Sequence, residues 1–362
     1  MRTAVVHDWL NGMRGGEKVL EAILPLVPDP TIFTLFHVPG SVSPAIERHP
    51  IRASSLNRLP FARAHYRHYL PFFARAIESF DLSGYDLVVS SSHCVAKGAI
   101  APPGVPHLCY CHTPVRYAYE QFDLYFPRGR TRFYRLKSTA IARLRAWDVA
   151  TASRPTRYLA NSTAVANRVL RRYGREAGVC HPPVDVEFFH PSETPARADF
   201  LLGVGALVPY KRYDLAIEAA GKLGRRLVLV GRGPEEARLR RLAPGSVEIL
   251  SGRSPEQLRD LYRTCAAFLQ PGEEDFGIAA VEALGCGAPV VALGRGGACD
   301  FVRDGVNGVL FGDETPAGLT GALRRALETR FDYTEIRASA LPFRGERFAG
   351  EFSKALAELE SR

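Results

Sequence analysis

The most informative segment of this 362-residue chain is Pro271-Gly272-Glu273-Glu274-Asp275-Phe276-Gly277-Ile278-Ala279-Ala280-Val281-Glu282-Ala283. It predicts the end of a strand, a turn that holds acids and a glycine, and the start of a helix. Backbone N–H groups at a helix start, together with the helix dipole, favour a bound phosphate. Glu274 in the turn can bind sugar hydroxyls, and Glu282 along the helix can bind both hydroxyls of a ribose. The structural alternative is that these acids only complement the helix start, and the following Gly285-Cys286-Gly287-Ala288-Pro289 argues against it.

Strands and helices alternate on both sides of this segment. In the second half the expected strands are Phe200–Val204, Arg226–Val230, Ala266–Leu269 and Pro289–Leu293, and the expected helices are Asp214–Leu223, Pro255–Thr264 and Ile278–Leu284. In the first half the expected strands are Ala4–Val6, Leu87–Ser90, His107–Cys111 and Tyr158–Ala160, and the expected helices are Glu17–Leu24 and Ala164–Tyr173. This alternation predicts an α/β protein with mostly parallel sheets covered by helices.

The segment Cys180-His181-Pro182-Pro183-Val184-Asp185 interrupts the pattern, because two adjacent prolines remove two backbone donors. We therefore expect two Rossmann-like domains, at residues 1–183 and 184–342, which face each other across a cleft. Residues 343–362 are expected to form a C-terminal helix that packs on the N-terminal domain. Within it, Arg347–Glu360 carries apolar residues at helical spacing.

Composition restricts the class of protein. Lys and Arg number 47 against 38 Asp and Glu, a net charge of +9 that fits a phosphate-rich partner: nucleic acid, an anionic membrane or a nucleotide. The seven cysteines include no CxxC pair, which favours a reducing, cytoplasmic compartment. Neither a signal peptide nor an apolar run long enough to span a bilayer is expected.

Three further motifs hold candidate ligand-binding groups. Val208–Asp214 places Lys211 and Arg212 between a strand and a helix, where both suit phosphate oxygens, although two such cations are more often a solvated surface. His112 follows an apolar strand, at the end where ligands bind, although a histidine of this kind is more often structural. Gly12–Lys18 is a glycine-rich turn after the first strand, and it matches neither a dinucleotide fingerprint nor a P-loop.

Taken in order, these four motifs resemble the family 4 retaining glycosyltransferases of GT-B fold. The nearest resemblance is to the mannosyltransferase branch that builds bacterial surface polysaccharide. It covers nearly the whole chain, including His7-Asp8-Trp9-Leu10, Tyr110–Tyr119, Asn161-Ser162, Pro182-Pro183-Val184-Asp185, Val208–Asp214 and Glu274–Glu282. The resemblance implies transfer of a hexose, mannose from GDP-mannose by preference, to a glycan acceptor that is expected to be linked to a polyprenyl diphosphate.

The resemblance also implies residue roles. His112, Lys211 and Glu274 would be catalytic: His112 touches the transferred sugar, Lys211 neutralises the leaving diphosphate and Glu274 holds sugar hydroxyls. Glu282 would bind the ribose, and Arg212 would assist Lys211. The other expected donor-binding residues are Gly15, Gly16, Gly231, Gly233, Arg253, Phe276, Gly277 and Ile278. On the acceptor side the resemblance implies Asp8, Arg116 and Tyr117.

One position departs from the family pattern. Many relatives carry an arginine where this chain has Ala206, so either Arg212 supplies that charge or fewer cations hold the diphosphate. No DxD motif lies in a loop suited to a divalent ion, and we expect transfer without metal or cofactor, with Lys211, Arg212 and helix amides stabilising the leaving group. No carboxylate nucleophile is evident near His112, which favours front-face attack with retention.

The acceptor side carries an interleaved basic and aromatic stretch, Arg58–Arg75, and a second basic run, Arg128–Arg145. Basic residues beside exposed aromatics suit an anionic bilayer surface, and the alternative is an aromatic core helix with a solvated basic face. We expect a cytoplasmic protein that docks peripherally on the inner membrane, and no nucleic-acid partner, since no such binding module is legible. A GT-B sugar-nucleotide 2-epimerase and a non-catalytic nucleotide-sugar-binding subunit stay open as alternatives.

Overall fold

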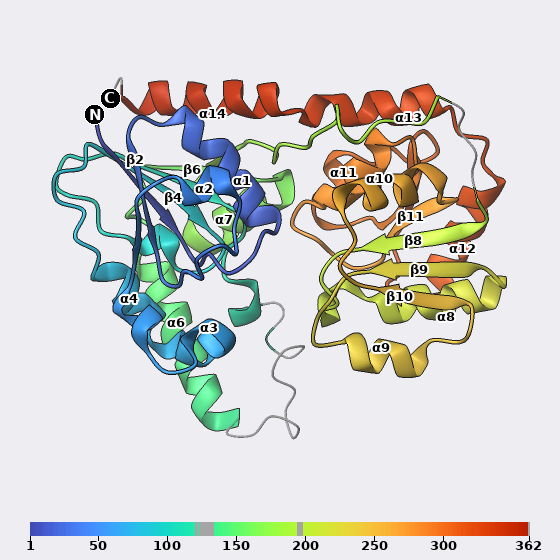
Figure 1. The fold of residues 1–362 in the computed structure, drawn as a ribbon, viewed down its shortest axis with the longest axis horizontal. Helices are drawn as coiled ribbons and strands as arrows, with labels where there is room; N and C mark the ends of the chain where they lie inside the picture. The colour runs from blue at the N-terminus through green and yellow to red at the C-terminus, as the bar shows by residue number, and fades with distance from the viewer. Residues whose placement is uncertain (120–121, 123–133, 194–197, 361–362) are drawn as a thin grey trace. The chain divides into compact units, whose positions relative to one another are not determined.

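The computed structural model describes residues 1–119, 122, 134–193 and 198–360. The chain divides into two compact units (Figure 1). The first unit comprises Met1–Pro183 with Glu346–Arg362, and the second comprises Val184–Gly345. Each unit is built on a parallel sheet with helices on both faces, so the predicted α/β architecture of two Rossmann-like sheets is confirmed.

The sheet of the first unit has the strand order β3-β2-β1-β4-β5-β6-β7, and every paired strand is parallel. Its strands are β1 (Thr3–His7), β2 (Pro30–Thr34), β3 (Ile51–Ala53), β4 (Leu87–Ser92), β5 (His107–Cys111), β6 (Arg157–Ala160) and β7 (Ala177–Val179). Its helices are α1 (Gly15–Ile23), α2 (Pro44–Glu47), α3 (Ala62–His65), α4 (Phe73–Glu78), α6 (Tyr134–Ala150), α7 (Thr163–Tyr173) and α14 (Gly345–Glu360). Because all neighbours are parallel, the carboxyl ends of the strands lie at one edge.

Side-chain alternation along the strands builds a separate core on each face of this sheet. In β1, Val5 belongs to the core that contains α1 and α14, while Ala4 and Val6 belong to the opposite core. Helix α14 supplies Phe348 and Phe352 to the first of these cores, both buried, and lies along the first unit in Figure 1. The prediction that the C-terminal helix returns to the N-terminal domain is therefore confirmed.

The second unit repeats the arrangement with the strand order β10-β9-β8-β11-β12-β13, again parallel. Its strands are β8 (Phe200–Val204), β9 (Arg226–Val230), β10 (Val247–Leu250), β11 (Ala267–Gln270), β12 (Val290–Leu293) and β13 (Gly308–Phe311). Its helices are α8 (Tyr213–Leu223), α9 (Glu236–Leu242), α10 (Pro255–Thr264), α11 (Ile278–Gly285), α12 (Pro316–Glu328) and α13 (Tyr333–Ala340). Strand β8 neighbours β9 on one side and β11 on the other, which is the switch point of this sheet, where α/β proteins bind ligands.

Two local expectations differ from the structure. Helix α1 begins at Gly15, not Glu17, because the Glu17 carboxylate accepts a hydrogen bond from the Arg14 amide (3.0 Å) and so closes the first turn two residues earlier. The basic and aromatic stretch is not one helix: α3, the 3₁₀ segment η3 (Tyr66–Phe72) and α4 follow one another. Pro71 lies inside η3, and it lacks the amide that a continuous helix would need.

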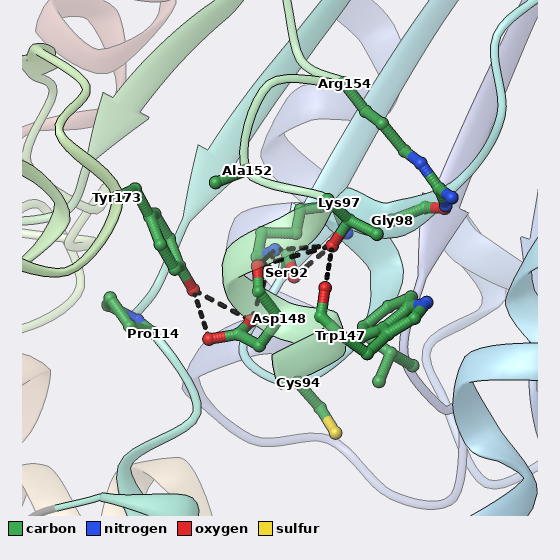
Figure 2. Close-up of polar contacts among 12 residues, drawn as sticks. Ser92, Cys94, Lys97, Gly98, Pro114, Trp147, Asp148, Ala152, Arg154 and Tyr173 are labelled. Carbon is green, nitrogen blue, oxygen red and sulfur yellow. Dashed lines mark hydrogen bonds and ion pairs between the residues drawn. The ribbon is translucent and has the colours of Figure 1, made fainter. Parts of the chain in front are cut away.

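A buried polar group joins α6 to the 3₁₀ turn η4 (Ala96–Gly98), which follows β4 (Figure 2). The Lys97 ammonium donates to the Asp148 carbonyl (2.6 Å) and the Thr151 hydroxyl (3.0 Å), and lies 3.2 Å from the Asp148 carboxylate. That carboxylate also accepts from the hydroxyls of Tyr173 (2.9 Å) and Tyr119 (3.0 Å). We call these five residues the Lys97 cluster. Lys97 is 1% and Asp148 0% exposed, so each charge depends on the other members for its compensation.

Candidate functional site

Lys211 and Glu274 form the charged centre of the candidate donor site. Lys211 ends the 3₁₀ turn η6 (Pro209–Lys211), between β8 and α8, and Glu274 lies in the loop between β11 and α11. The lysine ammonium lies 2.5 Å from a Glu274 carboxylate oxygen, and only 8% of the lysine is exposed. Burial alone would lower the pKa of Lys211, but the Glu274 carboxylate outweighs it and raises that pKa, so the ammonium is charged at neutral pH. Two of the three residues that were predicted to be catalytic, Lys211 and Glu274, are therefore in direct contact.

Glycines let the loops around this pair approach one another. A Cβ at Gly205 would overlap the Lys211 ammonium, and one at Gly272 would overlap the Tyr210 carbonyl. A Cβ at Gly231 would overlap the Gly205 carbonyl, and one at Gly233 the Leu207 carbonyl. Gly231 and Gly233, predicted to contact phosphates or base, thus also serve to pack the loop after β9 against the loop after β8.

Helix α11 carries the second predicted carboxylate. Glu282 is 5% exposed, and it accepts a hydrogen bond from the Tyr262 hydroxyl of α10 (2.9 Å). Gly277 caps the helix at φ 110°, a conformation that a residue with a Cβ rarely adopts, and Ile278 is its first residue. The Phe276 side chain is buried among Phe301 and Phe343, so only its backbone is available to a ligand.

Arg212 and Arg253, the other predicted donor-binding cations of the second unit, differ from Lys211 in burial and in ion pairing. The Arg212 guanidinium pairs with Asp214 (3.2 Å) and with Glu314 (2.7 Å), and the residue adopts φ 53° at the start of α8. Its charge is therefore already compensated, which does not favour the expectation that it replaces the arginine missing at Ala206. Arg253 lies in the exposed loop after β10 and has no ion-pair partner among the residues that the structure describes.

The candidate group in the first unit is a histidine cluster at the carboxyl ends of β1, β4 and β5. The Ser91 hydroxyl lies between two rings, 3.1 Å from Nδ1 of His7 and 2.8 Å from Nε2 of His112. All three residues are buried, and His112 keeps 9% exposure. A Cβ at Gly16, in the first turn of α1, would lie 3.7 Å from the His7 ring and 3.9 Å from Nε2 of His112. Gly16, which the sequence predicted as a donor contact, and His112 are thus neighbours.

Asp8, predicted on the acceptor side, is fully buried. One carboxylate oxygen accepts from the amides of His93 (2.7 Å) and Cys94 (2.8 Å), and the other from Val95 (2.7 Å) and Ala96 (2.9 Å). The His93 ring lies 3.3 Å from the same carboxylate. Asp8 therefore binds the turn after β4, which gives it a structural role that the sequence did not indicate.

The remaining predicted residues of the first unit are close in sequence to Gly16 and His112. Gly15 is the first residue of α1, and Arg116 and Tyr117 belong to the 3₁₀ turn η5 (Arg116–Ala118) after β5. Arg116 is 8% exposed, and the Tyr117 side chain lies outside the described part of the structure. Within Arg128–Arg145, residues 128–133 also lie outside it.

The sequence did not identify four residues that the structure connects to these groups: His7, Glu17, Ser91 and Tyr262. His7 belongs to a motif that was noted, but no pattern signals that Ser91, on a strand remote in sequence, lies between two histidines. Among the described residues, no three His, Cys, Asp or Glu side chains group as metal ligands would, and no helix there is long and apolar enough to cross a bilayer.

Two family models match the chain. Residues 185–340 match the model described as glycosyl transferases group 1, and residues 31–188 match that described as glycosyltransferase family 4. Curated relatives include the D-inositol 3-phosphate glycosyltransferase of Acidothermus cellulolyticus, 32% identical over 56% of this chain and 54% of the relative. That of Geodermatophilus obscurus is 35% identical over 54% of this chain and 49% of the relative. The chain thus spans about half the length of the curated relatives it matches.

Solved structures agree on the fold. HepE of Anabaena in complex with UDP-glucose has a TM-score of 0.74 and 18% identity, covering 99% of this chain and 100% of that one. The sucrose-phosphate synthase of Thermosynechococcus elongatus has a TM-score of 0.73 and 18% identity over the whole of both chains. The two sheets thus define a protein of GT-B fold. Together the two family models match residues 31–340, so the chain is similar to the group 1, family 4 glycosyltransferases over most of its length.

Proposed function

We propose that this protein is a retaining glycosyltransferase that moves a hexose from a nucleotide-sugar to a glycan acceptor, without a metal ion. The Lys211–Glu274 pair carries the proposal, because it joins a phosphate-binding cation to a carboxylate that can hold sugar hydroxyls, at the switch point of the second sheet. Glu282, in the helix that starts beside this pair, suits the ribose of the same donor.

The reaction requires positive charge beside the departing diphosphate. Cleavage of a glycosyl–phosphate bond builds negative charge on the departing phosphate, and a preorganised cation with helix amides stabilises it. A buried Lys211 supplies this charge without reorganisation. Glu274 compensates the ammonium in the structure, and on donor binding the phosphate would take over part of that role while Glu274 turns to sugar hydroxyls.

Retention favours front-face attack. Near the histidine cluster, the Asp8 carboxylate accepts four backbone amides and is fully buried, which makes it a poor nucleophile. Glu17 is 2% exposed and accepts from the Arg14 amide. Neither carboxylate is free to form a glycosyl-enzyme, so the leaving phosphate would accept the proton of the acceptor.

We expect a nucleoside diphosphate to stabilise the protein against thermal unfolding. A ligand at about 100 times its Kd adds ~2.7 kcal/mol when it binds only the folded state. GDP and GDP-mannose represent the donor that the sequence resemblance favours, and UDP and UDP-glucose represent the ligand named for HepE. Each is tested with Mg²⁺ and with EDTA, and equal stabilisation in both supports metal-independent binding.

Variants assign the stabilisation to the proposed site. Glu282→Gln should weaken nucleotide binding about tenfold or more, because a ribose hydroxyl loses a charged acceptor. Glu248→Gln, which changes an exposed glutamate of β10 paired with Arg226, should leave nucleotide binding unchanged. Stabilisation that is equal in Glu282→Gln and the wild type would contradict the assignment, and release of an epimer from donor alone would favour the epimerase.

The surface of the segment Arg58–Arg75 supports a membrane-associated acceptor. Phe61 is 78% and Phe72 56% exposed, whereas Tyr66 and Phe73 of the same stretch are buried in the core. Phe61 holds φ 57°, unusual for a residue with a Cβ. The exposed Arg58, Arg67 and Arg75 have no carboxylate partner among the described residues. Exposed phenylalanines flanked by uncompensated arginines fit the interface of an anionic bilayer, where a polyprenyl-diphosphate-linked glycan would lie.

We expect the protein to co-sediment with phosphatidylcholine vesicles that contain phosphatidylglycerol, and much less with phosphatidylcholine alone. The double variant Phe61→Ser with Phe72→Ser should lower the partition coefficient about tenfold or more, because two apolar side chains lose their burial in the bilayer. Leu242→Ser, at an exposed leucine of α9, serves as the matched control. Binding that is independent of anionic lipid, or equal in both variants, would overturn the membrane assignment.

A further inference from the structure

Residues 112–119, which we call the β5 loop, contain most of the residues predicted to bind sugar or acceptor in the first unit. The loop begins at His112, directly after β5, and includes η5 with Arg116 and Tyr117. Backbone bonds close η5 on itself, among them one from the Tyr119 amide to the Arg116 carbonyl (3.0 Å). Side chains of α6 and α7 then attach the loop at both of its ends.

Arg168 of α7 holds the start of the loop. Its guanidinium donates to the Thr113 hydroxyl (2.8 Å), and that hydroxyl donates in turn to the Pro114 carbonyl (3.0 Å). Arg168 is 3% exposed, so little water competes for this bond, and its loss would leave a buried charged donor without one of its acceptors. The contact therefore fixes the residue that follows His112.

The Lys97 cluster holds the end of the loop. The Tyr119 hydroxyl donates to the Asp148 carboxylate of α6 (3.0 Å), and it keeps its proton because burial and that carboxylate raise the pKa of Tyr119. Two guanidinium groups lie over the Tyr119 ring, that of Arg172 at 4.4 Å and that of Arg145 at 5.6 Å from the ring centroid. Arg145 also donates through Nε to the Ala118 carbonyl.

This arrangement gives Arg145 a use that differs from the one predicted. The sequence associated the basic run Arg128–Arg145 with an anionic bilayer, whereas the Arg145 guanidinium contacts the β5 loop within the first unit. The carboxylate that binds Tyr119 is also the partner of Lys97, which is buried. The end of the loop is thus attached to a buried ion pair.

We infer that Arg168 and Asp148 are positioning residues for the acceptor, because by holding Thr113 and Tyr119 they fix the β5 loop in the geometry that binds the acceptor glycan. A loop without these attachments would have to be ordered when the acceptor binds, and the lost entropy would weaken acceptor binding. The role in acceptor binding rests on the proposed function, whereas the attachment of the loop is a property of the protein alone.

Hydrogen exchange of the full chain, followed by mass spectrometry on peptides that cover residues 112–119, tests the attachment. Tyr119→Phe and Thr113→Val each remove one hydroxyl and should speed exchange of these residues about tenfold, because each breaks a hydrogen bond to a charged group. Thr113→Ser keeps the hydroxyl and should exchange as the wild type does.

Tyr173→Phe is the matched control, because the Tyr173 hydroxyl donates to the same Asp148 carboxylate (2.9 Å) but belongs to α7 and not to the loop (Figure 2). Thermal unfolding should show a loss of stability similar to that of Tyr119→Phe. Exchange of residues 112–119 should stay at the wild-type rate.

Steady-state kinetics tests the role in acceptor binding, with a donor found by the nucleotide screen and a synthetic polyprenyl-diphosphate-linked monosaccharide as the acceptor probe. Tyr119→Phe and Thr113→Val should raise the acceptor KM about tenfold and leave the donor KM unchanged, a split that a general loss of folding would not produce. Thr113→Ser and Tyr173→Phe should keep the wild-type acceptor KM.

The outcomes separate this inference from the proposed function. Exchange that Tyr119→Phe and Thr113→Val leave unchanged overturns the inference, and so does exchange that Tyr173→Phe speeds equally. Faster exchange with an unchanged acceptor KM overturns the positioning role. Faster exchange in a protein that binds no nucleotide would uphold the attachment of the loop and reject the proposed function, and the acceptor role with it.

Discussion

Replacing Lys211 with methionine is expected to lower kcat/KM for sugar transfer by about a hundredfold or more. The ammonium is buried and preorganised, and a fixed cation at a developing negative charge contributes ~3–4 kcal/mol to transition-state stabilisation. Because Glu274 raises the pKa of Lys211, the wild-type ammonium stays protonated over the neutral assay range, and its own titration should not appear in the pH profile there. Steady-state kinetics with the donor found by the nucleotide screen measures the loss.

Two variants separate lost catalysis from lost folding. Lys211→Met leaves the Glu274 carboxylate without its partner, so some loss of stability is also expected. The double variant Lys211→Met with Glu274→Gln removes both charges and should regain stability without regaining activity. Lys222→Met, at an exposed lysine of α8 paired with Glu218, should change neither. An active double variant would refute a role for Lys211 at the leaving group.

Replacing Lys97 with methionine is expected to lower the free energy of unfolding of the first unit by about 3–5 kcal/mol. The change leaves the Asp148 carboxylate buried without its cation, a penalty that breaking a buried pair usually carries. Asp148→Ala should be at least as severe, because it leaves the buried Lys97 ammonium without its counter-charge and the hydroxyls of Tyr119 and Tyr173 without their acceptor. These changes remove polar bonds between α6 and η4 (Figure 2).

Tryptophan fluorescence during urea unfolding measures this loss. The chain's two tryptophans, Trp9 and Trp147, both belong to the first unit, and Trp147 is the helical neighbour of Asp148. Lys97→Met combined with Asp148→Ala should cost less than the two single losses added, because neither charge is then left alone. A loss below about 1 kcal/mol in Lys97→Met, or strictly additive losses, would show that the Lys97 cluster is not a coupled unit.

Local sequence patterns predicted most of the strands and helices, because the residues that form each element are adjacent in the chain. Continuous apolar runs such as Leu227–Val230 are strands buried on both faces, and caps such as Ser162, whose hydroxyl accepts from the Val165 amide, mark helix starts. The spacing of Glu274 and Glu282 around Gly277 similarly indicated a turn that enters a helix, and α11 begins at Ile278. The capping bond that starts α1 early was missed, because it depends on the contact of a single side chain. The break at Pro71, which the alternative of one aromatic helix overlooked, is by contrast a local signal.

The sequence by itself determined the α/β class, the succession of strands and helices, and the residue types available for a donor site. Only the tertiary structure decided which of those residues have their charge free. It paired Arg212 with Asp214 and Glu314, filled both oxygens of Asp8 with backbone amides, and placed Ser91 between His7 and His112. The physical reason is that a periodic apolar pattern sets which face of an element is buried, whereas a hydrogen bond between strands depends on their register and order, which no local pattern encodes.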